Sequence, residues 1–185
     1  MEPRAVVLVE GVSDQRALEE LAARAGRNLD DERIAVLSMG GATGIGTFLE
    51  RFGPGGLDLT LAGLCDEAEE SLFRRALERA GLGCDLTRAD MEALGFFTCV
   101  ADLEDELIRA LGADCVQQVI RDQGELASFR TFQRQPGWQE RSREEQLRRF
   151  LGTRGGRKIH YAQLLVGVLD LARVPRPLDR LLAHL

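Results

Sequence analysis

The chain has 185 residues, 44% of them hydrophobic and 29% charged, which is the composition of an ordinary globular domain rather than a disordered segment. Its net charge of −6 argues against coating nucleic acid through bulk positive charge, but it leaves room for a local acidic metal site with a basic rim. No apolar run approaches the roughly 20 residues that span a bilayer, and the first residues lack a signal-peptide layout. We therefore expect a cytoplasmic protein with no membrane partner.

The four cysteines form no CxxC pair, which argues against a zinc knuckle or a redox motif. Cys65 and Cys99 lie in apolar, strand-like runs, where a cysteine is usually a small buried hydrophobe. A reducing compartment fits this usage.

Hydrophobic runs and helical spacing alternate through the first two thirds of the chain. Strands are predicted at residues 5–9, 34–39, 57–64 and 96–100. Helices are predicted at residues 13–26, 47–52 and 67–80, and in a long segment from 102 to about 123 that breaks near Gly112. This alternation predicts an α/β fold with a parallel sheet of about four strands flanked by helices.

From about Gly124 the pattern changes. Residues 126–138 are predicted to be irregular, while helices are predicted at 143–150, at 158–171 and in a short segment at the C-terminus. We therefore predict a catalytic core at residues 1–123, with a mostly helical extension at residues 124–185 packed on it.

Acidic residues follow three of the four predicted strands. Glu10 follows the first strand, Asp66 the third, and Asp102 and Glu104 the fourth, while Asp14 lies one helical turn beyond Glu10. Ligands of open parallel sheets bind beyond the carboxyl ends of the strands, so these carboxylates should meet at one edge. Carboxylate oxygens suit hard divalent ions such as Mg²⁺, and two such ions can activate water and stabilise the leaving oxygen of a phosphodiester.

Each acid also has a plainer interpretation. Asp14 and Asp102 stand at predicted helix starts, where an acid is stabilised by the helix dipole alone. The glycine-rich stretch GGATGIG at residues 40–46 lacks the GK[ST] of a P-loop and does not follow the first strand, so closing a tight turn is its favoured role. Only the combination of acids after three strands favours a metal site.

The sequence resembles the TOPRIM domains shared by topoisomerases, primases, RecR-type repair proteins and OLD (overcoming lysogenization defect) nucleases. VLVEGVSDQRALEEL resembles the first TOPRIM motif, in which a glutamate ends the first strand, and VLSMGG resembles the second strand with its glycine turn. CVADLEDEL is similar to the Ser-x-x-Asp-Leu-Glu motif of the OLD branch, and GRKIHYAQLL to its lysine-bearing helix. The resemblance implies a Rossmann-like TOPRIM fold and covers most of the chain.

The resemblance also implies a site for phosphodiester chemistry that depends on Mg²⁺ or Mn²⁺, with two ions when active. Glu10 and Asp14 would bind one ion, with Asp66 shared or nearby, while Asp102 and Glu104 would complete the second position. Lys158 would neutralise charge on the scissile phosphate. A solvated lysine at a helix start is the equally weighted alternative for that residue.

The sequence departs from the family pattern in two motifs. Where the family has Asp-x-Asp at the third strand, this sequence reads Asp66-Glu67-Ala68, so Glu67 or Glu69 would have to supply the second carboxylate from a rearranged turn. Cys99 replaces the serine of the OLD motif. These 185 residues also contain no P-loop, so we expect a stand-alone TOPRIM protein or one that uses an ATPase subunit in trans, and a homodimer is compatible with either.

Arginines concentrate in the second half of the chain, with Phe129, Phe132 and Trp138 among them. Arg130, Arg134 and Arg157 are predicted to bind nucleic acid together with Lys158. The alternative is a solvated helical face over core aromatics, because acidic residues are interspersed. His160 and Tyr161 are expected to be packed and hydrogen-bonded rather than catalytic.

Three functions fit these features. The favoured one is a metal-dependent endonuclease of the OLD type that cleaves or nicks DNA by a two-metal mechanism, with no ATPase activity of its own. The second keeps the fold but cuts RNA, as the ribosomal-RNA maturases of the superfamily do. The third is a degenerate TOPRIM module that binds nucleic acid or a partner without catalysis, which Ala68 favours.

Overall fold

The computed structural model describes residues 2–153 and 155–185, and its centre is a parallel β-sheet in the order β2-β1-β3-β4. Its strands are β1 (Ala5–Val9), β2 (Ile34–Ser38), β3 (Thr60–Asp66) and β4 (Phe96–Cys99). Central strand β1 is wholly buried, and its Val7 lies opposite Val36 of β2 and Ala62 of β3. The predicted four-stranded parallel sheet is confirmed.

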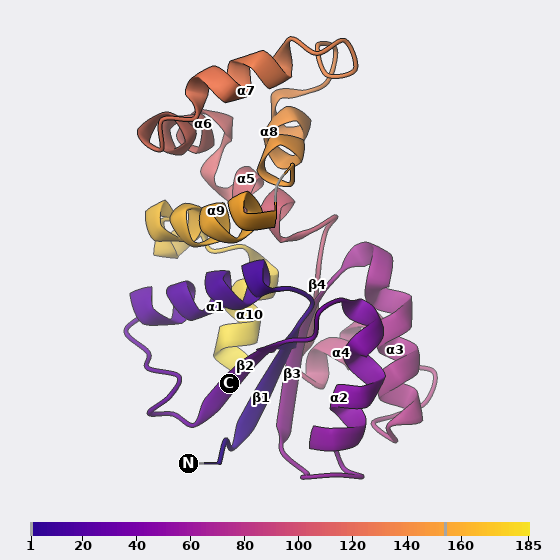
Figure 1. Ribbon diagram of the computed structural model, residues 1–185. Coiled ribbons are helices and arrows are strands. Elements are labelled where there is room, and N and C mark those ends of the chain that lie inside the picture. The colour runs from indigo at the N-terminus through magenta and orange to yellow at the C-terminus, as the bar shows by residue number, and fades with distance from the viewer. Residues whose placement is uncertain (1, 154) are drawn as a thin grey trace.

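Helices cover both faces of the sheet (Figure 1). One face carries α1 (Val12–Arg24), α9 (Gly155–Val168) and α10 (Arg176–His184). The other carries α2 (Ile45–Phe52), α3 (Glu70–Arg79) and α4 (Arg88–Ala93). Both chain ends lie towards the edge of the sheet where its strands begin, and Nη2 of Arg4 donates to the carbonyl oxygen of Leu185 at 2.9 Å (Figure 1).

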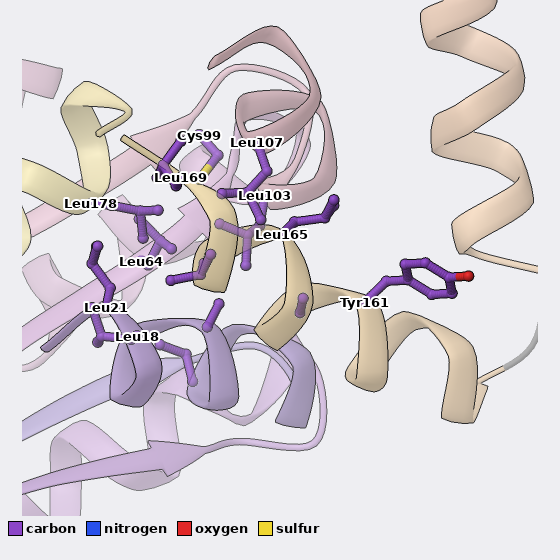
Figure 2. Close-up of a cluster of buried hydrophobic side chains, with 14 of the residues drawn as sticks. Leu18, Leu21, Leu64, Cys99, Leu103, Leu107, Tyr161, Leu165, Leu169 and Leu178 are labelled. Atoms are coloured by element: carbon purple, nitrogen blue, oxygen red, sulfur yellow. The ribbon is translucent and has the colours of Figure 1, made fainter. Parts of the chain in front are cut away.

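Alternation along β1 sends side chains into two separate cores. Val7 and Val9 join the cluster under α1 and α9, whereas Val6 and Leu8 join the cluster under α2 and α3. In the first cluster, Leu18 and Leu21 of α1 lie on the side of α1 that packs on α9 with its Leu165, while Tyr161 of α9 extends away from the sheet (Figure 2). Cys99 is fully buried there and Cys65 is buried in the second cluster, which confirms that both thiols pack as small hydrophobes.

Beyond β4 the chain leaves the sheet through α5 (Leu103–Leu111) and forms a projection that we call the helical arm, residues 113–151. The arm consists of α6 (Ala113–Asp122), α7 (Leu126–Gln133) and α8 (Arg143–Leu151). The predicted break at Gly112 is confirmed, since this residue has φ 79° between α5 and α6.

The prediction of an irregular segment at 126–138 was wrong over its first half, because α7 forms there. Phe129 and Phe132 are buried against Phe150 of α8, with ring centroids 5.1 and 5.9 Å away. Tertiary packing of these aromatic rings stabilises a helix with a weak sequence pattern. Helix α4 was not predicted at all.

Other element boundaries shift by a few residues. Strand β3 begins at Thr60 instead of 57, because Leu57 is 61% exposed and Asp58 has φ 50° in the preceding turn. Helix α9 begins at Gly155 and ends at Val168, and α10 then packs on β3 and β4. The boundary between residues 123 and 124 stays a prediction. In the part of the chain that is described, no helix has both the length and the apolar character needed to cross a membrane.

Candidate active site

A hydrogen bond to the side chain of Glu10 links the carboxyl ends of β1 and β3. This glutamate directly follows β1, and its Oε1 accepts a hydrogen bond from the backbone N–H of Asp66 at 3.0 Å. Asp66 itself is the last residue of β3. Because β1 and β3 are neighbours in the sheet, their parallel pairing places these two carboxylates at one edge.

Asp14 joins them from the first turn of α1. Its Oδ2 accepts a hydrogen bond from the N–H of Gly11 at 2.8 Å, so it helps to cap its own helix. Its side chain is nevertheless buried, and its charge acts on Glu10 and Asp66. The position at a helix start, on which the plainer interpretation of Asp14 rests, is present together with proximity to the other acids.

Asp102 lies beyond β4, where the backbone is strained. Ala101 has φ 65°, a left-handed conformation that side chains other than glycine rarely adopt. Asp102 caps α5 by accepting a hydrogen bond at Oδ1 from the N–H of Asp105, at 2.8 Å. Its other oxygen, Oδ2, accepts a hydrogen bond from Nε of Arg148 in the arm at 2.7 Å and lies 2.7 Å from Nη2 of the same guanidinium.

Glu104 and Lys158 form the most buried pair of the site. Glu104 is only 4% exposed, and its Oε2 lies 3.1 Å from Nζ of Lys158 in α9. Its other oxygen, Oε1, is buried and has no hydrogen-bond partner among the described residues. A buried carboxylate oxygen without a partner costs free energy, so this atom is a candidate ligand for a cation.

The acids raise one another's pKa values. Burial, followed by the charges of Glu10, Asp14 and Asp102, raises the pKa of Asp66 to about 8. Burial raises the pKa of Glu104 to about 7 despite the opposing charge of Lys158. The pKa values of Glu10 and Asp14 are also raised, mainly by burial. The site therefore holds more negative charge than it can stabilise by itself, which is typical of a cation site.

The donor set fits a hard divalent ion, although the side chains do not already enclose one. Within residues 2–153 and 155–185, no three His, Cys, Asp or Glu side chains are grouped closely enough to hold a metal ion. Two of the candidate ligands are instead held by cations of the protein, Asp102 by Arg148 and Glu104 by Lys158. A metal ion would therefore compete with these side chains for carboxylate oxygens.

The turn after β3 shows how the missing second aspartate affects the site. Residues Glu67–Glu69 form a 3₁₀ turn in which Ala68 is exposed. Glu67 is exposed and lies 3.3 Å from Arg88, whereas the charge of Glu69 raises the pKa of Glu10. Glu69 is therefore the better placed of the two acids to replace the missing carboxylate. The effect of Glu69 on the pKa of Glu10 distinguishes it from Glu67, whereas the spacing in the sequence does not.

The glycine-rich stretch forms a tight turn beside Glu10. Gly40 and Gly41 have φ values of 73° and 126°, and the N–H of Gly41 donates to the carbonyl oxygen of Glu10 at 2.9 Å. A side chain at either glycine would be strained. Closing the turn is thus the role that the structure gives these residues, as the sequence favoured.

The predicted nucleic-acid-binding residues do not lie together. Lys158 is at the acidic edge, while Arg130 and Arg134 are exposed on and just after α7 in the arm. The guanidinium of Arg157 bonds within the protein, where Nη2 lies 2.6 Å from Oε1 of Glu125 and the side chain is 8% exposed. Another arginine, Arg148, makes the direct contact with the acids; the sequence places it in an arginine-rich helix but not beside Asp102.

His160 and Tyr161 of α9 are hydrogen-bonded, as predicted. Tyr161 is 1% exposed and donates to Oε2 of Glu125 at 2.8 Å. His160 lies 3.0 Å from Oε1 of Gln123 but is exposed, so the expectation that it is packed was wrong.

Comparison with known proteins agrees with this geometry. Residues 3–67 match the sequence model of the family described as "Overcoming lysogenization defect protein-like, TOPRIM domain". The C-terminal region of the Xanthomonas campestris pv. campestris OLD protein is 26% identical, with a TM-score of 0.74 over 98% of this chain and 94% of that one. The C-terminal region of the Burkholderia pseudomallei OLD protein is 22% identical, with a TM-score of 0.76 over 100% and 97%. No curated protein matches.

The expected resemblance to OLD-type TOPRIM domains is therefore confirmed, and the likeness in structure extends through the helical arm to the C-terminus. The chain has the TOPRIM fold in the form found in the C-terminal regions of OLD proteins. Both regions lie at the end of longer proteins, as their descriptions state.

Proposed function

We propose that this protein is a metal-dependent endonuclease of the OLD type, which cleaves or nicks DNA with two bound Mg²⁺ or Mn²⁺ ions. The observation that carries this proposal is the convergence of carboxylates from the ends of β1, β3 and β4 with a lysine from α9. Three separate strands deliver acids to one edge, and helix capping alone does not require that.

The chain's own residues have distinct roles in this proposal. Glu10 and Asp14 would hold one ion, Asp102 and Glu104 the second, and Asp66 would lie between them. When bound, the ions would lower the pKa of a water molecule and stabilise the leaving oxygen. At neutral pH Asp66 retains a proton, which the arrival of a cation would displace.

Lys158 of α9 contributes positive charge to the site. Its pKa is raised by the charges of Glu104, Asp14 and Asp102, against the effect of burial, so it stays protonated at neutral pH. With Glu104 serving as a ligand of a metal ion, the ammonium group of Lys158 would be available to neutralise a phosphate oxygen. Arg148 would be released from Asp102 in the same way.

The decisive test is incubation of the protein with plasmid DNA in Mg²⁺, Mn²⁺ or EDTA. Glu10→Gln preserves an acceptor for the N–H of Asp66, and Asp102→Asn preserves the cap of α5, so both variants remove charge with little change in shape. We expect cleavage that needs metal and falls at least about 100-fold in each variant. Glu67→Gln, which alters an exposed acid paired with Arg88, should cleave normally.

The substrate arms of this test decide between DNA and RNA. A structured RNA of the same length is incubated beside the plasmid, and preferential cleavage of the RNA would favour a maturase-type function. Cleavage that survives both Glu10→Gln and Asp102→Asn would contradict the assigned site. An ATPase partner would be indicated if cleavage required an added ATPase subunit together with ATP.

The second candidate is a TOPRIM module that binds nucleic acid without cutting it. Two observations favour it: Ala68 stands where the family has a carboxylate, and the described acids do not already form a metal cage. Calorimetric titration with Mn²⁺ separates the candidates, since a degenerate site would bind no metal and Asp102→Asn would change nothing. Tight binding of two ions per chain would exclude it.

A further inference from the structure

A cleft of about 460 Å³ lies where the helical arm meets the acidic edge. Asp102, Glu104 and Lys158 line it on one side, so it opens directly onto the proposed metal site. Its volume falls within the roughly 300–1,000 Å³ typical of sites that enclose a small ligand. It matches a single nucleotide unit better than a double helix.

The arm side of the cleft supplies a tryptophan and positive charge. Trp138, Arg141, Arg148 and Arg149 line this side together with one acid, Glu145. Arg149 is exposed and makes no salt bridge within the described residues, while Arg141 has only a long, exposed contact of 3.5 Å with Glu145. Exposed pairs of this kind contribute little, so both guanidinium groups can turn to a phosphate.

Buried hydrogen bonds hold the loop that carries Trp138. The side chain of Gln146 is 6% exposed, and its Nε2 donates to the carbonyl oxygens of Trp138 and Arg141 at 2.7 and 3.2 Å. The Oε1 of Gln146 accepts from Gln133 at 2.7 Å, so both ends of its amide are used. The loop is therefore anchored to the arm, which fixes Trp138 at the mouth of the site.

Trp138 is partly buried, and its ring packs on Phe132 with centroids 5.1 Å apart. A large aromatic residue that is supported from within the arm and still lines a charged cleft is suited to stacking on a base. Inside a duplex both faces of each base are covered by its neighbours, so away from duplex ends such stacking requires an unpaired base.

We propose that this cleft binds one strand of unpaired DNA, with a base stacked on Trp138 and the adjoining phosphates bound by Arg141 and Arg149. The proposal deepens the function proposed above, since it names single-stranded or frayed DNA as the form that enters the site. The strand would run from the arm to the acidic edge, which delivers a phosphate towards Lys158.

Trp138 is the chain's one tryptophan, so its fluorescence reports on this site alone. We would titrate the protein in EDTA with a 15-nucleotide single strand, with the same sequence as a blunt duplex, and with a strand of abasic phosphates. Stacking predicts quenching by the single strand, and much less by the duplex or the abasic strand. Equal quenching by all three would overturn the proposal.

Variants separate stacking from packing. Trp138→Phe keeps a ring and should retain most of the affinity for the single strand, measured by anisotropy of a labelled oligonucleotide. Trp138→Leu keeps apolar contact with Phe132 but has no ring, and should bind about 5- to 150-fold more weakly. Thermal unfolding of each variant controls for folding, and unchanged affinity of a folded Trp138→Leu would contradict the proposal.

Metal-dependent cleavage of plasmid and of single strands, measured in parallel, separates this proposal from the proposed function. Single-strand binding without any cleavage would support the proposed role of the cleft and contradict the proposed nuclease activity. The opposite result is cleavage of duplex DNA that shows no preference for single strands and is unaffected by Trp138→Leu. It would support the nuclease activity and contradict the proposed role of the cleft. A stronger preference for single-stranded RNA would assign the cleft to RNA and overturn the proposal for DNA.

Discussion

The acidic edge of the sheet and the helical arm differ in how their charges are arranged. At the edge, backbone topology forces carboxylates together, and burial with mutual repulsion raises their pKa values. In the arm, by contrast, a small aromatic core holds the helices together and the arginines point into solvent or pair with single acids. Negative charge is thus crowded at the edge in the absence of a bound cation, whereas the charges of the arm are spread over its surface.

The ion pair of Arg148 with Asp102 connects these regions, and the pair of Lys158 with Glu104 lies within the acidic edge. In both pairs the protein's own cation occupies an oxygen that a metal would need. The difference between the regions therefore predicts that metal binding reorganises the contact between arm and edge, while the folds of the two regions remain as they are.

The largest effect should come from the arm's core. Phe129→Ala removes a fully buried ring that packs on Phe150 and should lower the free energy of unfolding by about 3–5 kcal/mol, measured by urea denaturation. Leu57→Ala, at an exposed position, is the matched control and should change it by less than about 0.5 kcal/mol.

The shape of that transition tests how separate the regions are. Arm and sheet share one contiguous cluster of buried residues, so we expect a single cooperative transition with a lower midpoint. Two transitions in Phe129→Ala would show instead that the arm unfolds independently and that the regions are less coupled than their shared core indicates.

The second prediction concerns pH and the acidic edge. The folded-state pKa of Asp66 is about 8, above its ordinary value of 3.8, so the folded state binds more protons than the unfolded state between these values. The free energy of unfolding without metal should therefore fall as the pH rises from about 5 to about 8. The raised pKa values of Glu10, Asp14 and Glu104 act in the same direction.

Asp66→Asn should remove much of this fall. Because Asp66 is partly exposed, we expect the variant to be more stable than the parent by about 1–2 kcal/mol at pH 8 without metal, after allowing for screening by solvent. Added Mg²⁺ should raise the melting temperature of the parent but not of the variant. A parent protein whose stability stays constant between pH 5 and 8 would contradict the crowding of charge at the edge.

The acidic edge could be predicted from the sequence, because the positions of its acids follow from the order of strands and helices. Alternating strands and helices define a parallel sheet, and acids directly after strands such as Glu10 and Asp102 must then share an edge. The site also depends on contacts between residues far apart in sequence, which spacing does not encode. Arg148 lies 46 residues after Asp102, and nothing in its helix distinguishes it from Arg149.

The arm was harder to predict for a related reason. Helix α7 has few residues and a mixed pattern, and it forms because Phe129 and Phe132 pack on α8, a contact that arises only in the folded chain. Arg157 likewise looked like an exposed cation, but its pairing with Glu125 turns it inward. The sequence identified the aromatic and arginine residues of this region, but not which of their side chains face solvent and which face the protein interior.

The smallest and most specific prediction concerns Arg148, which links the two regions. Arg148→Ala frees Oδ2 of Asp102, so Mn²⁺ should bind more tightly without DNA. The pair is half exposed on the arginine side, which limits the gain to about 0.2–1 kcal/mol, or up to roughly 5-fold in the dissociation constant measured by calorimetry.

Arg149→Ala is the matched control, because it removes the same charge from the same cleft without a bond to Asp102. Any general electrostatic gain in metal affinity should appear in both variants, and only the excess in Arg148→Ala measures competition for the carboxylate. Arg149→Ala should weaken DNA binding with or without metal, and Arg148→Ala should weaken it only when metal is present, each reducing the salt dependence by about one phosphate contact. Tighter metal binding combined with weaker DNA binding would show that Arg148 exchanges Asp102 for phosphate when the metal enters. Equal metal affinity in the two variants would mean that the metal binds without displacing the arm's arginine.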